Sequence, residues 1–370
     1  MTALAIVFWV SLGLIVYSQI GYPLALWLLQ AFKRSQVEEL EQPPVSLIVA
    51  AHNEEDVIAD KIANVLALDY PREKLEVIVA SDGSTDATAE RARSAGADLV
   101  LELDRAGKVP AQNAAVARAS GQLLAFSDAN STWDPGAMAA LVSAFGAPEV
   151  GYACGRLRLT GAGGDNQEGL YWRYEMKLRE MESGLAGVTA GNGAIYMTRR
   201  ESYIELDSAR SHDGSFPFML AKRGLRSLDV PGAVASEPMA PTIGDEFARK
   251  RRIMRPLWDV VVLDGMLSPR GYSPLYAFEI FSHRLLRYAA PLLHLIALAA
   301  NIALLGDGTI YAATLAAQLA VLAAAGLASL IPIAPFRIAR YYVSVTASVV
   351  AGLWDRFRQG PRSAGWDTAR

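Results

Sequence analysis

The chain has 370 residues, of which 52% are hydrophobic, and its formal net charge is −3. This charge excludes the strongly basic field of a nucleic-acid-binding protein, and the single cysteine, Cys154, excludes an internal disulfide framework. One cysteine also fits a reducing compartment. The length allows one sizeable domain together with membrane segments.

The N-terminal segment, residues 1–32, carries no charged side chain and is followed directly by Lys33 and Arg34. About 20 mostly apolar residues are enough to cross a bilayer as a helix. The segment lacks the basic start and short apolar core of a cleaved signal peptide. We therefore expect a retained transmembrane helix over residues 1–32.

The middle of the chain, residues 43–260, alternates apolar runs with helical patterns. The apolar runs predict strands over 45–50, 75–80, 99–103 and 123–126. Helices are expected over 54–68, after an N-cap at Ser84 or Thr85, and from Gly107 onward. This alternation favours an α/β domain with a mostly parallel sheet covered by helices on both faces.

The C-terminal third is apolar again. An amphipathic stretch over 275–287 predicts an interfacial helix, and uncharged runs within 288–331 predict a transmembrane hairpin. In the last segment, 341–370, the apolar run 341–354 is short for a span and is interpreted as interfacial or re-entrant. The lysines and arginines beside these segments favour an outside N-terminus, a cytoplasmic middle domain and a cytoplasmic tail. The tail would change sides if the short run spans the membrane.

Polar residues follow three of the predicted strands: His52-Asn53-Glu54, Ser81-Asp82-Gly83 and Asp128-Ala129-Asn130. Each group alone is more simply explained as a turn or a helix cap. Ligands of parallel sheets bind outside the carboxyl ends of the strands. Because all three groups stand at such ends, we expect them to form one site.

The chain resembles the membrane-embedded family 2 inverting glycosyltransferases from about Val45 to Arg255. Six ordered motifs carry this resemblance: Ala51-His-Asn-Glu-Glu55, Ser81-Asp-Gly-Ser-Thr-Asp86, Asp128-Ala-Asn130, Gly191-Asn-Gly-Ala-Ile-Tyr196, Ser211-His-Asp213 and Arg249-Lys-Arg-Arg-Ile253. It implies a GT-A (Rossmann-like) fold and transfer from a nucleotide-sugar, with UDP favoured, to a lipid-linked or glycan acceptor. It also implies an integral, multi-pass protein of the plasma or inner membrane.

The resemblance implies a donor site with a divalent ion. The donor-binding residues would be Ala51, Asn53, Glu54, Asp82, Lys108 and Asp128. Mg²⁺ or Mn²⁺ would be held by Asp128 and Asn130, with asparagine in place of the family's usual second aspartate. A diphosphate supplies further oxygen ligands, so one or two protein oxygens suffice. The alternative is a helix-capping turn before Pro135.

The resemblance also implies an acceptor side. Its residues would be Gly191, Asn192, Gly193 and Arg249, with Asp213 as the catalytic base and Arg252 as a helper at the leaving group. Asp213 could equally cap a helix, and His212 replaces the acid that commonly precedes the base. Glu182, on the helix before the Gly191 motif, could face the acceptor as well, but an exposed helix acid is the simpler interpretation. The family's closing tryptophan is Ile253 here, which counts against synthesis of a long polymer.

Two other functions fit the same motifs. One is a processive exopolysaccharide synthase of the cellulose, hyaluronan or poly-N-acetylglucosamine type, which shares every donor-side motif. The other is a membrane-anchored nucleotide-binding protein without catalysis, which would not need both Asp128 and Asp213. The expected partners are therefore the donor, the acceptor and the bilayer, with no nucleic acid.

Overall fold

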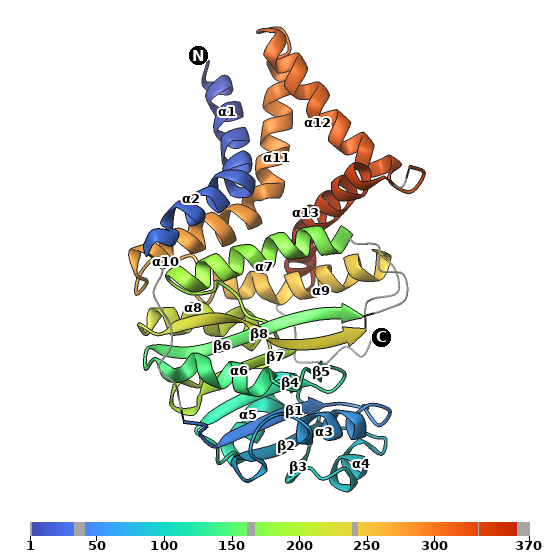
Figure 1. The fold of residues 1–370 in the computed structure, drawn as a ribbon. Coiled ribbons are helices and arrows are strands. Elements are labelled where there is room, and N and C mark those ends of the chain that lie inside the picture. Colours follow the sequence, from blue (N-terminus) through green and yellow to red (C-terminus); the bar gives the residue numbers. More distant parts are fainter. Residues whose placement is uncertain (1, 33–40, 161–166, 239–242, 332, 361–370) are drawn as a thin grey trace.

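A computed structural model describes residues 2–32, 41–160, 167–238, 243–331 and 333–360 (Figure 1). A body of sheet and helices carries three helices that project from one end: α1 (Ala3–Val16), α11 (Leu286–Ala303) and α12 (Thr309–Leu327). Two further helices, α7 (Gln167–Leu185) and α9 (Ile243–Val262), lie between these projecting helices and the sheet.

The sheet has eight strands in the order β3-β2-β1-β4-β7-β6-β8-β5. Their bounds are β1 Val45–Ala51, β2 Leu75–Asp82, β3 Leu99–Leu103, β4 Leu123–Asp128, β5 Thr132–Trp133, β6 Val150–Thr160, β7 Ile195–Arg199 and β8 Arg226–Pro238. The first four strands run parallel to one another, as predicted. β7 is antiparallel to β4 and β6, and β5 is antiparallel to β8, so the other half of the sheet is mixed.

Helices cover both faces of the sheet: α3 (Ile58–Leu66), α4 (Thr88–Ser94), α5 (Lys108–Arg118), α6 (Ala137–Ser143) and α8 (His212–Lys222). Successive side chains of a strand point to opposite faces. Leu47 and Val49 of β1 accordingly pack in one core with side chains of α3 and α6. Ile48 packs in a second core with side chains of α5 and α8. The expected two-sided α/β layering is confirmed.

Two helices begin later than the sequence indicates. The helix predicted from residue 54 begins at Ile58, and the one predicted to be capped by Ser84 or Thr85 begins at Thr88. The polar side chains that suggested caps bind across the two loops instead. For example, Ser84 Oγ accepts a hydrogen bond from the backbone nitrogen of Asn53 (3.1 Å).

Within the described part of the chain, three helical segments are long and apolar enough to cross a membrane: Ala3–Phe32, Pro274–Ala303 and Thr309–Leu327. They match the predicted N-terminal helix and the predicted hairpin. α12 leaves large apolar side chains such as Leu319 and Leu322 exposed. A large exposed apolar surface of this kind is typical of contact with lipid.

The stretch 275–287, predicted as an interfacial helix of its own, is not a separate element. α10 (Pro274–Glu279), a π-helical turn (Ile280–Leu285) and α11 form one continuous helix. The charged residues that suggested a water-facing helix bind protein groups instead. Arg284 Nε donates to Thr189 Oγ1 (3.0 Å), and an Arg287 guanidinium nitrogen donates to Glu175 Oε2 (2.9 Å).

The segment 341–354 is also longer than predicted. It lies inside α13 (Ala334–Gln359), an amphipathic helix that packs on α9, and its interfacial placement stays a prediction. Arg251 makes two hydrogen bonds to Asp355 (2.6 Å each), and Trp258 Nε1 donates to the Val349 carbonyl (3.1 Å). The tail over 361–370 lies outside the described residues.

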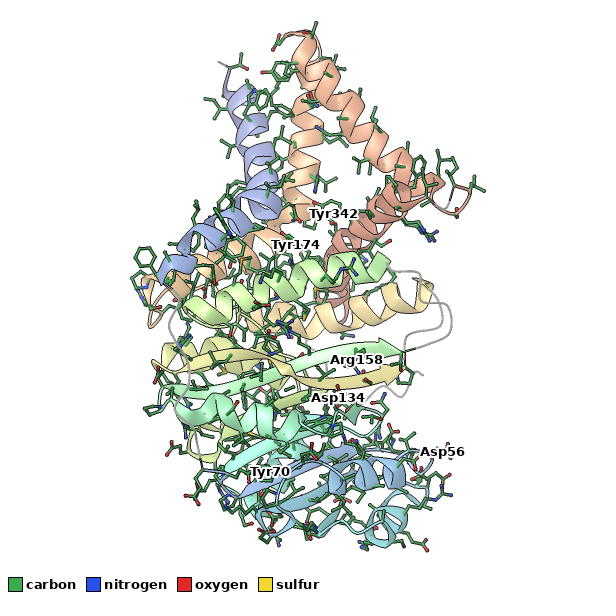
Figure 2. The ribbon with its side chains drawn as sticks, viewed as in Figure 1. Asp56, Tyr70, Asp134, Arg158, Tyr174 and Tyr342 are labelled. Atoms are coloured by element: carbon green, nitrogen blue, oxygen red, sulfur yellow. The ribbon has the colours of Figure 1, made fainter. Side chains whose placement is uncertain are left out.

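Contacts join the projecting helices to the body. Figure 2 shows Tyr174 on α7 and Tyr342 on α13 in the region between them. Tyr174 Oη donates to the Gln19 carbonyl (3.0 Å) in the π-helical turn Tyr17–Gly21, which links α1 to α2 (Tyr22–Leu29).

An ion pair joins β6 to the segment after β5: Arg158 and Asp134, also labelled in Figure 2, lie 3.0 Å apart.

Candidate active site

The carboxyl ends of β1, β2 and β4 meet at one edge of the sheet, as predicted. In the strand register, Ala51 stands beside Ser81 and Ala50 stands beside Asp128. The loops after these strands therefore start side by side. The three polar groups identified in the sequence come together at this edge.

The loop after β1 is bound to the loop after β2. Asn53 has a left-handed backbone (φ 52°), and its side-chain oxygen accepts from the Thr85 nitrogen (2.9 Å). Glu55 accepts from the Ala87 nitrogen (3.2 Å). Ala51 is fully buried, so the structure exposes no part of it to a ligand. Glu54 is half-buried. Donor contacts of Ala51, Asn53 and Glu54 stay predictions. In the structure, the Asn53 side chain helps to hold the two loops together.

Asp82 is fully buried at the end of β2. One carboxylate oxygen accepts from the backbone nitrogens of Ala106 (2.7 Å) and Gly107 (3.0 Å), and the other accepts from Gly107 (2.9 Å). Asp82 therefore fixes the loop that precedes α5. In this arrangement its carboxylate is turned to the backbone, and contact with a nucleobase would need the loop to move.

Lys108 begins α5 directly after that loop and forms an ion pair with Asp128 Oδ1 at the end of β4. Burial opposes the charge of the ammonium group, but the Asp128 and Asp213 carboxylates outweigh it and raise the pKa of Lys108. Asp128 is partly exposed and Asn130 is exposed. The ion pair places one positive and one negative group together at the strand-end edge.

Asp213 comes from a distant part of the chain and lies near the same ion pair. It stands in the first turn of α8, and its carboxylate is partly exposed. A methyl group built on Gly193 would lie 3.8 Å from Asp213 Cγ and 3.9 Å from Lys108 Nζ. Gly193 is therefore flanked by the two side chains. Asp128, Lys108 and Asp213 gather in one place.

The segment 187–193, which we call the acceptor loop after its predicted role, runs from the end of α7 to the Gly193 position. Gly191 donates its backbone N–H to the Asp213 carbonyl (2.8 Å), and its own carbonyl accepts from Arg179 (2.9 Å). A methyl group on Gly191 would lie 1.9 Å from Tyr152 Oη. The Asn192 side chain accepts from the Ala194 nitrogen (3.0 Å) and donates to the Gly155 carbonyl on β6 (3.3 Å). The loop is therefore closely fitted around Asp213.

His212, which replaces an acid beside the predicted base, is buried and cannot serve as a second carboxylate. Its ring nitrogens face Tyr196 Oη (2.6 Å) and Tyr203 Oη (3.3 Å). Burial, reinforced by the charge of Lys108, lowers the pKa of His212 to about 3. The imidazole is neutral at physiological pH and anchors the start of α8.

Lys61 was not identified as a site residue from the sequence. It stands on the apolar face of α3, with Ile58, Ile62 and Val65, and its ammonium donates to the Ser131 carbonyl (2.8 Å). Burial lowers the pKa of Lys61 to about 7, against the opposing effect of Asp128. A lysine at apolar helix spacing was the signal that could have revealed it.

Glu237 near the end of β8 is a second residue that the sequence did not reveal. By strand register its neighbour Ser236 pairs with Thr132, so Glu237 reaches the segment that follows Asp128. Its charge acts on both Lys61 and Lys108. No local motif marks this acid, because only sheet pairing brings it to the site.

Three remaining predictions have different outcomes. Glu182 is buried on α7, with 1% of its surface exposed, so its interpretation as an exposed helix acid is wrong. The reason is that α2 and the π-helical turn Ile280–Leu285 cover that face of α7. Arg249 and Arg252 lie on α9, and their side chains lie outside the described part of the structure.

Comparison with known proteins gives a family match and several relatives. Residues 46–207 match the model of glycosyl transferase family 2. An N-acetylglucosaminyltransferase from Rhizobium meliloti (strain 1021) is 27% identical over 266 residues, covering 66% of this chain and 62% of that protein. A poly-β-1,6-N-acetyl-D-glucosamine synthase from Staphylococcus aureus (strain MSSA476) is 34% identical over 128 residues, covering 33% of this chain and 30% of that protein.

One solved structure is similar over nearly the whole chain. It is a mannosyltransferase from Pyrobaculum calidifontis in complex with GDP-Man and Mn²⁺, with a TM-score of 0.73 and 22% identity. The match covers 96% of this chain and 99% of that chain. It confirms the predicted GT-A fold. The chain spans less than two thirds of the length of the R. meliloti relative.

Proposed function

Residues 46–207 belong to glycosyl transferase family 2, and on that premise we propose that the protein transfers a sugar from a nucleotide-sugar to a membrane-associated acceptor. The observation that carries this proposal is the gathering of Asp128, Lys108 and Asp213 at one edge of the sheet, with Gly193 flanked by the last two. A carboxylate, an ammonium group and a second carboxylate suit a metal-bound diphosphate beside a proton acceptor.

The donor lies on the strand-end side of the site. Lys108 supplies positive charge to the diphosphate, because charge-assisted hydrogen bonds to phosphate oxygens are among the strongest in proteins. The loops after β1 and β2, which contain Asn53 and Asp86, are bonded to each other and frame the nucleotide. UDP is the favoured nucleotide on the family resemblance.

The residues present fit Mg²⁺ or Mn²⁺ as a partner of the diphosphate. Asp128 and Asn130 offer the hard oxygen ligands that these ions prefer. Among the described residues, no group of three or more histidine, cysteine, aspartate or glutamate side chains could hold an ion alone. Phosphate oxygens would complete the coordination, and the ion would offset the negative charge of the departing nucleoside diphosphate.

Asp213 acts as the general base. Its partly exposed carboxylate accepts the proton of the acceptor hydroxyl while the hydroxyl oxygen attacks the anomeric carbon. The sugar–phosphate bond breaks on the opposite side, so the configuration at the anomeric carbon is inverted. Arg252 and Arg249 on α9 would assist at the leaving group and the acceptor.

The acceptor is a lipid or a lipid-linked glycan at the cytoplasmic face of the membrane. The candidate spans Ala3–Phe32 and Pro274–Ala303 meet the body next to the acceptor loop. Arg284 and Arg287 of the second span bind Thr189 and Glu175 of the body, and arginines on that side favour a cytoplasmic catalytic domain in a multi-pass protein. An acceptor anchored in the bilayer would thereby enter beside Asp213.

A donor panel tests the proposal. The full chain in detergent is incubated with UDP-GlcNAc, UDP-glucose, UDP-galactose and GDP-mannose, each with Mn²⁺, Mg²⁺ or a chelator, and with a membrane lipid extract as acceptor. We expect metal-dependent nucleotide release from at least one donor, and loss of that release in Asp128→Ala. Nucleotide release from none of the donors would contradict transfer activity. Release that persists in Asp128→Ala, or in the chelator, would contradict the metal site.

A second candidate function is processive polymer synthesis. Identity of 34% to a poly-N-acetylglucosamine synthase over 128 residues favours it, whereas Ile253 in place of the family's tryptophan disfavours a long-glycan platform. Product length separates the two functions. We expect one or a few added sugars per acceptor, measured by mass spectrometry of the reaction products.

A further inference from the structure

A cluster of buried polar groups lies outside the proposed transfer site. It is found where two membrane-side helices, α2 and the helix that begins at Pro274, meet α7 and the acceptor loop. Its centre is Glu182 on α7. Glu182 Oε1 accepts hydrogen bonds from Tyr22 Oη (2.6 Å) on α2 and from His283 Nδ1 (2.6 Å) in the π-helical turn before α11. Glu182 Oε2 accepts from Thr189 Oγ1 (3.3 Å) in the acceptor loop. One carboxylate thus joins three separate parts of the chain to α7.

The acceptor loop receives two further hydrogen bonds from the helix Pro274–Ala303, which also contains His283. Arg284 Nε donates to Thr189 Oγ1 (3.0 Å), and Tyr276 Oη donates to the Val188 carbonyl (3.1 Å). Gly191 follows Thr189 by two residues, a span of at most about 7 Å. Because Gly191 donates to the Asp213 carbonyl, the membrane-side bonds end close to the proposed base.

Burying a carboxylate between helices costs free energy, because its charge is removed from water and must be stabilised by hydrogen bonds or ion pairs instead. Burial opposes ionisation of Glu182, yet the charge and hydrogen bond of His283 hold the pKa of Glu182 below its ordinary value. The other ring nitrogen of His283 faces Glu175 (3.5 Å). An apolar side chain could fill the same space on α7, but it could not bond Tyr22, His283 and Thr189 at once.

We propose that Glu182 is a positioning residue that holds the acceptor loop in place beside Asp213 from the membrane side. The proposal rests on the proposed function, in which the loop faces the acceptor. It assigns the N-terminal membrane helix a part in the site, because Tyr22 supplies one of the bonds that fix the Glu182 carboxylate. The helix is then more than an anchor.

Amide hydrogen exchange of the full chain in detergent tests the positioning role without activity. In Glu182→Gln, we expect exchange in the acceptor loop to rise at least about tenfold, while exchange in β4 stays unchanged. Tyr22→Phe is a milder variant that removes one hydroxyl, and we expect a smaller rise at the same amides. Tyr17→Phe is its matched control, because the Tyr17 hydroxyl bonds Ser282 (2.8 Å) and not Glu182. Unchanged exchange in the loop of Glu182→Gln would overturn the proposal.

The kinetic arm uses the donor that turns over in the panel and the same lipid extract. We expect Glu182→Gln to raise the KM for the extract about tenfold and to leave the donor KM within twofold. An equal rise of both values would overturn the positioning role and indicate general loosening. If no donor turns over in the unaltered protein, the proposed function fails, and the exchange measurement still decides whether Glu182 holds the loop.

Discussion

The predicted donor side of the candidate site is built from neighbouring loops at one sheet edge, whereas the predicted acceptor side is held by groups from distant parts of the chain. Asp82, Lys108 and Asp128 stand at or just beyond the ends of parallel strands. The acceptor loop instead takes bonds from α7, α8 and the helix that begins at Pro274. Short sequence motifs at the strand ends are therefore enough to locate the donor side. Locating the acceptor side requires knowledge of which distant segments pack together.

The largest expected effect comes from Asp213, where the two sides meet. Asp213→Asn keeps the shape of the side chain but removes the proton acceptor, so we expect transfer to fall by roughly 10²–10⁴-fold. Donor affinity should stay within about twofold, because Lys108 and Asp128 remain in place. Turnover and equilibrium binding of the nucleotide-sugar measure the two quantities separately.

Asp207→Asn is the control for this variant, because Asp207 is an exposed acid just before α8 whose carboxylate pairs with Arg210. It should transfer sugar at nearly the unaltered rate. If Asp213→Asn lost donor binding as severely as turnover, Asp213 would belong to the donor side, and the division between the two sides would fail.

Two glycines of the acceptor loop, Gly191 and Gly193, are expected to differ in how much an added methyl group lowers the free energy of unfolding. A methyl group on Gly191 would meet Tyr152 Oη at 1.9 Å, whereas on Gly193 it would make contacts of 3.8 Å or more. Overpacking costs about 1–3 kcal/mol, so Gly191→Ala should lower the free energy of unfolding by that amount. Gly193→Ala should change it by less than about 0.5 kcal/mol.

Denaturant unfolding of the detergent-solubilised variants measures this difference. Gly193→Ala should still slow transfer, because its methyl group enters the space between Asp213 and Lys108. Equal stability of the two variants would show that the loop yields readily, contrary to its closely bonded geometry.

The sequence predicted what depends on local pattern. Apolar runs located β1 to β4, and the polar residues after them located the edge where Asp128 stands. The order of the motifs predicted Asp213 near this edge, and the structure brings it beside Lys108. These features follow from strand ends and helix starts, which nearby residues determine.

The remaining features depend on contacts that local pattern does not encode. Glu182 looked like an exposed acid because helix α7 gives no sign of what covers it, and Glu237 reaches the site only through sheet pairing. The helix 274–303 looked interrupted because Arg284 and Arg287 suggested water, whereas Thr189 and Glu175 bind them. Partners far away in the chain decided each of these cases.

The last prediction concerns Lys61, the buried lysine on the predicted donor side. Its pKa is about 7 in the folded protein, against an ordinary value of 10.5. Between these two values the unfolded chain binds more protons than the folded one, so folding stability rises with pH. Below pH 7 both states are protonated and the folded protein carries the full cost of the buried charge.

Lys61→Met removes this titration, so its stability should rise less steeply than that of the unaltered protein from pH 7 to 9. The difference in slope is at most about 1.4 kcal/mol per pH unit. Denaturant titrations at several pH values measure it, with Lys177→Met as the control because Lys177 is exposed on α7. Parallel slopes for Lys61→Met and the unaltered protein would mean that the Lys61 ammonium stays charged, held by Ser131 and the nearby acids.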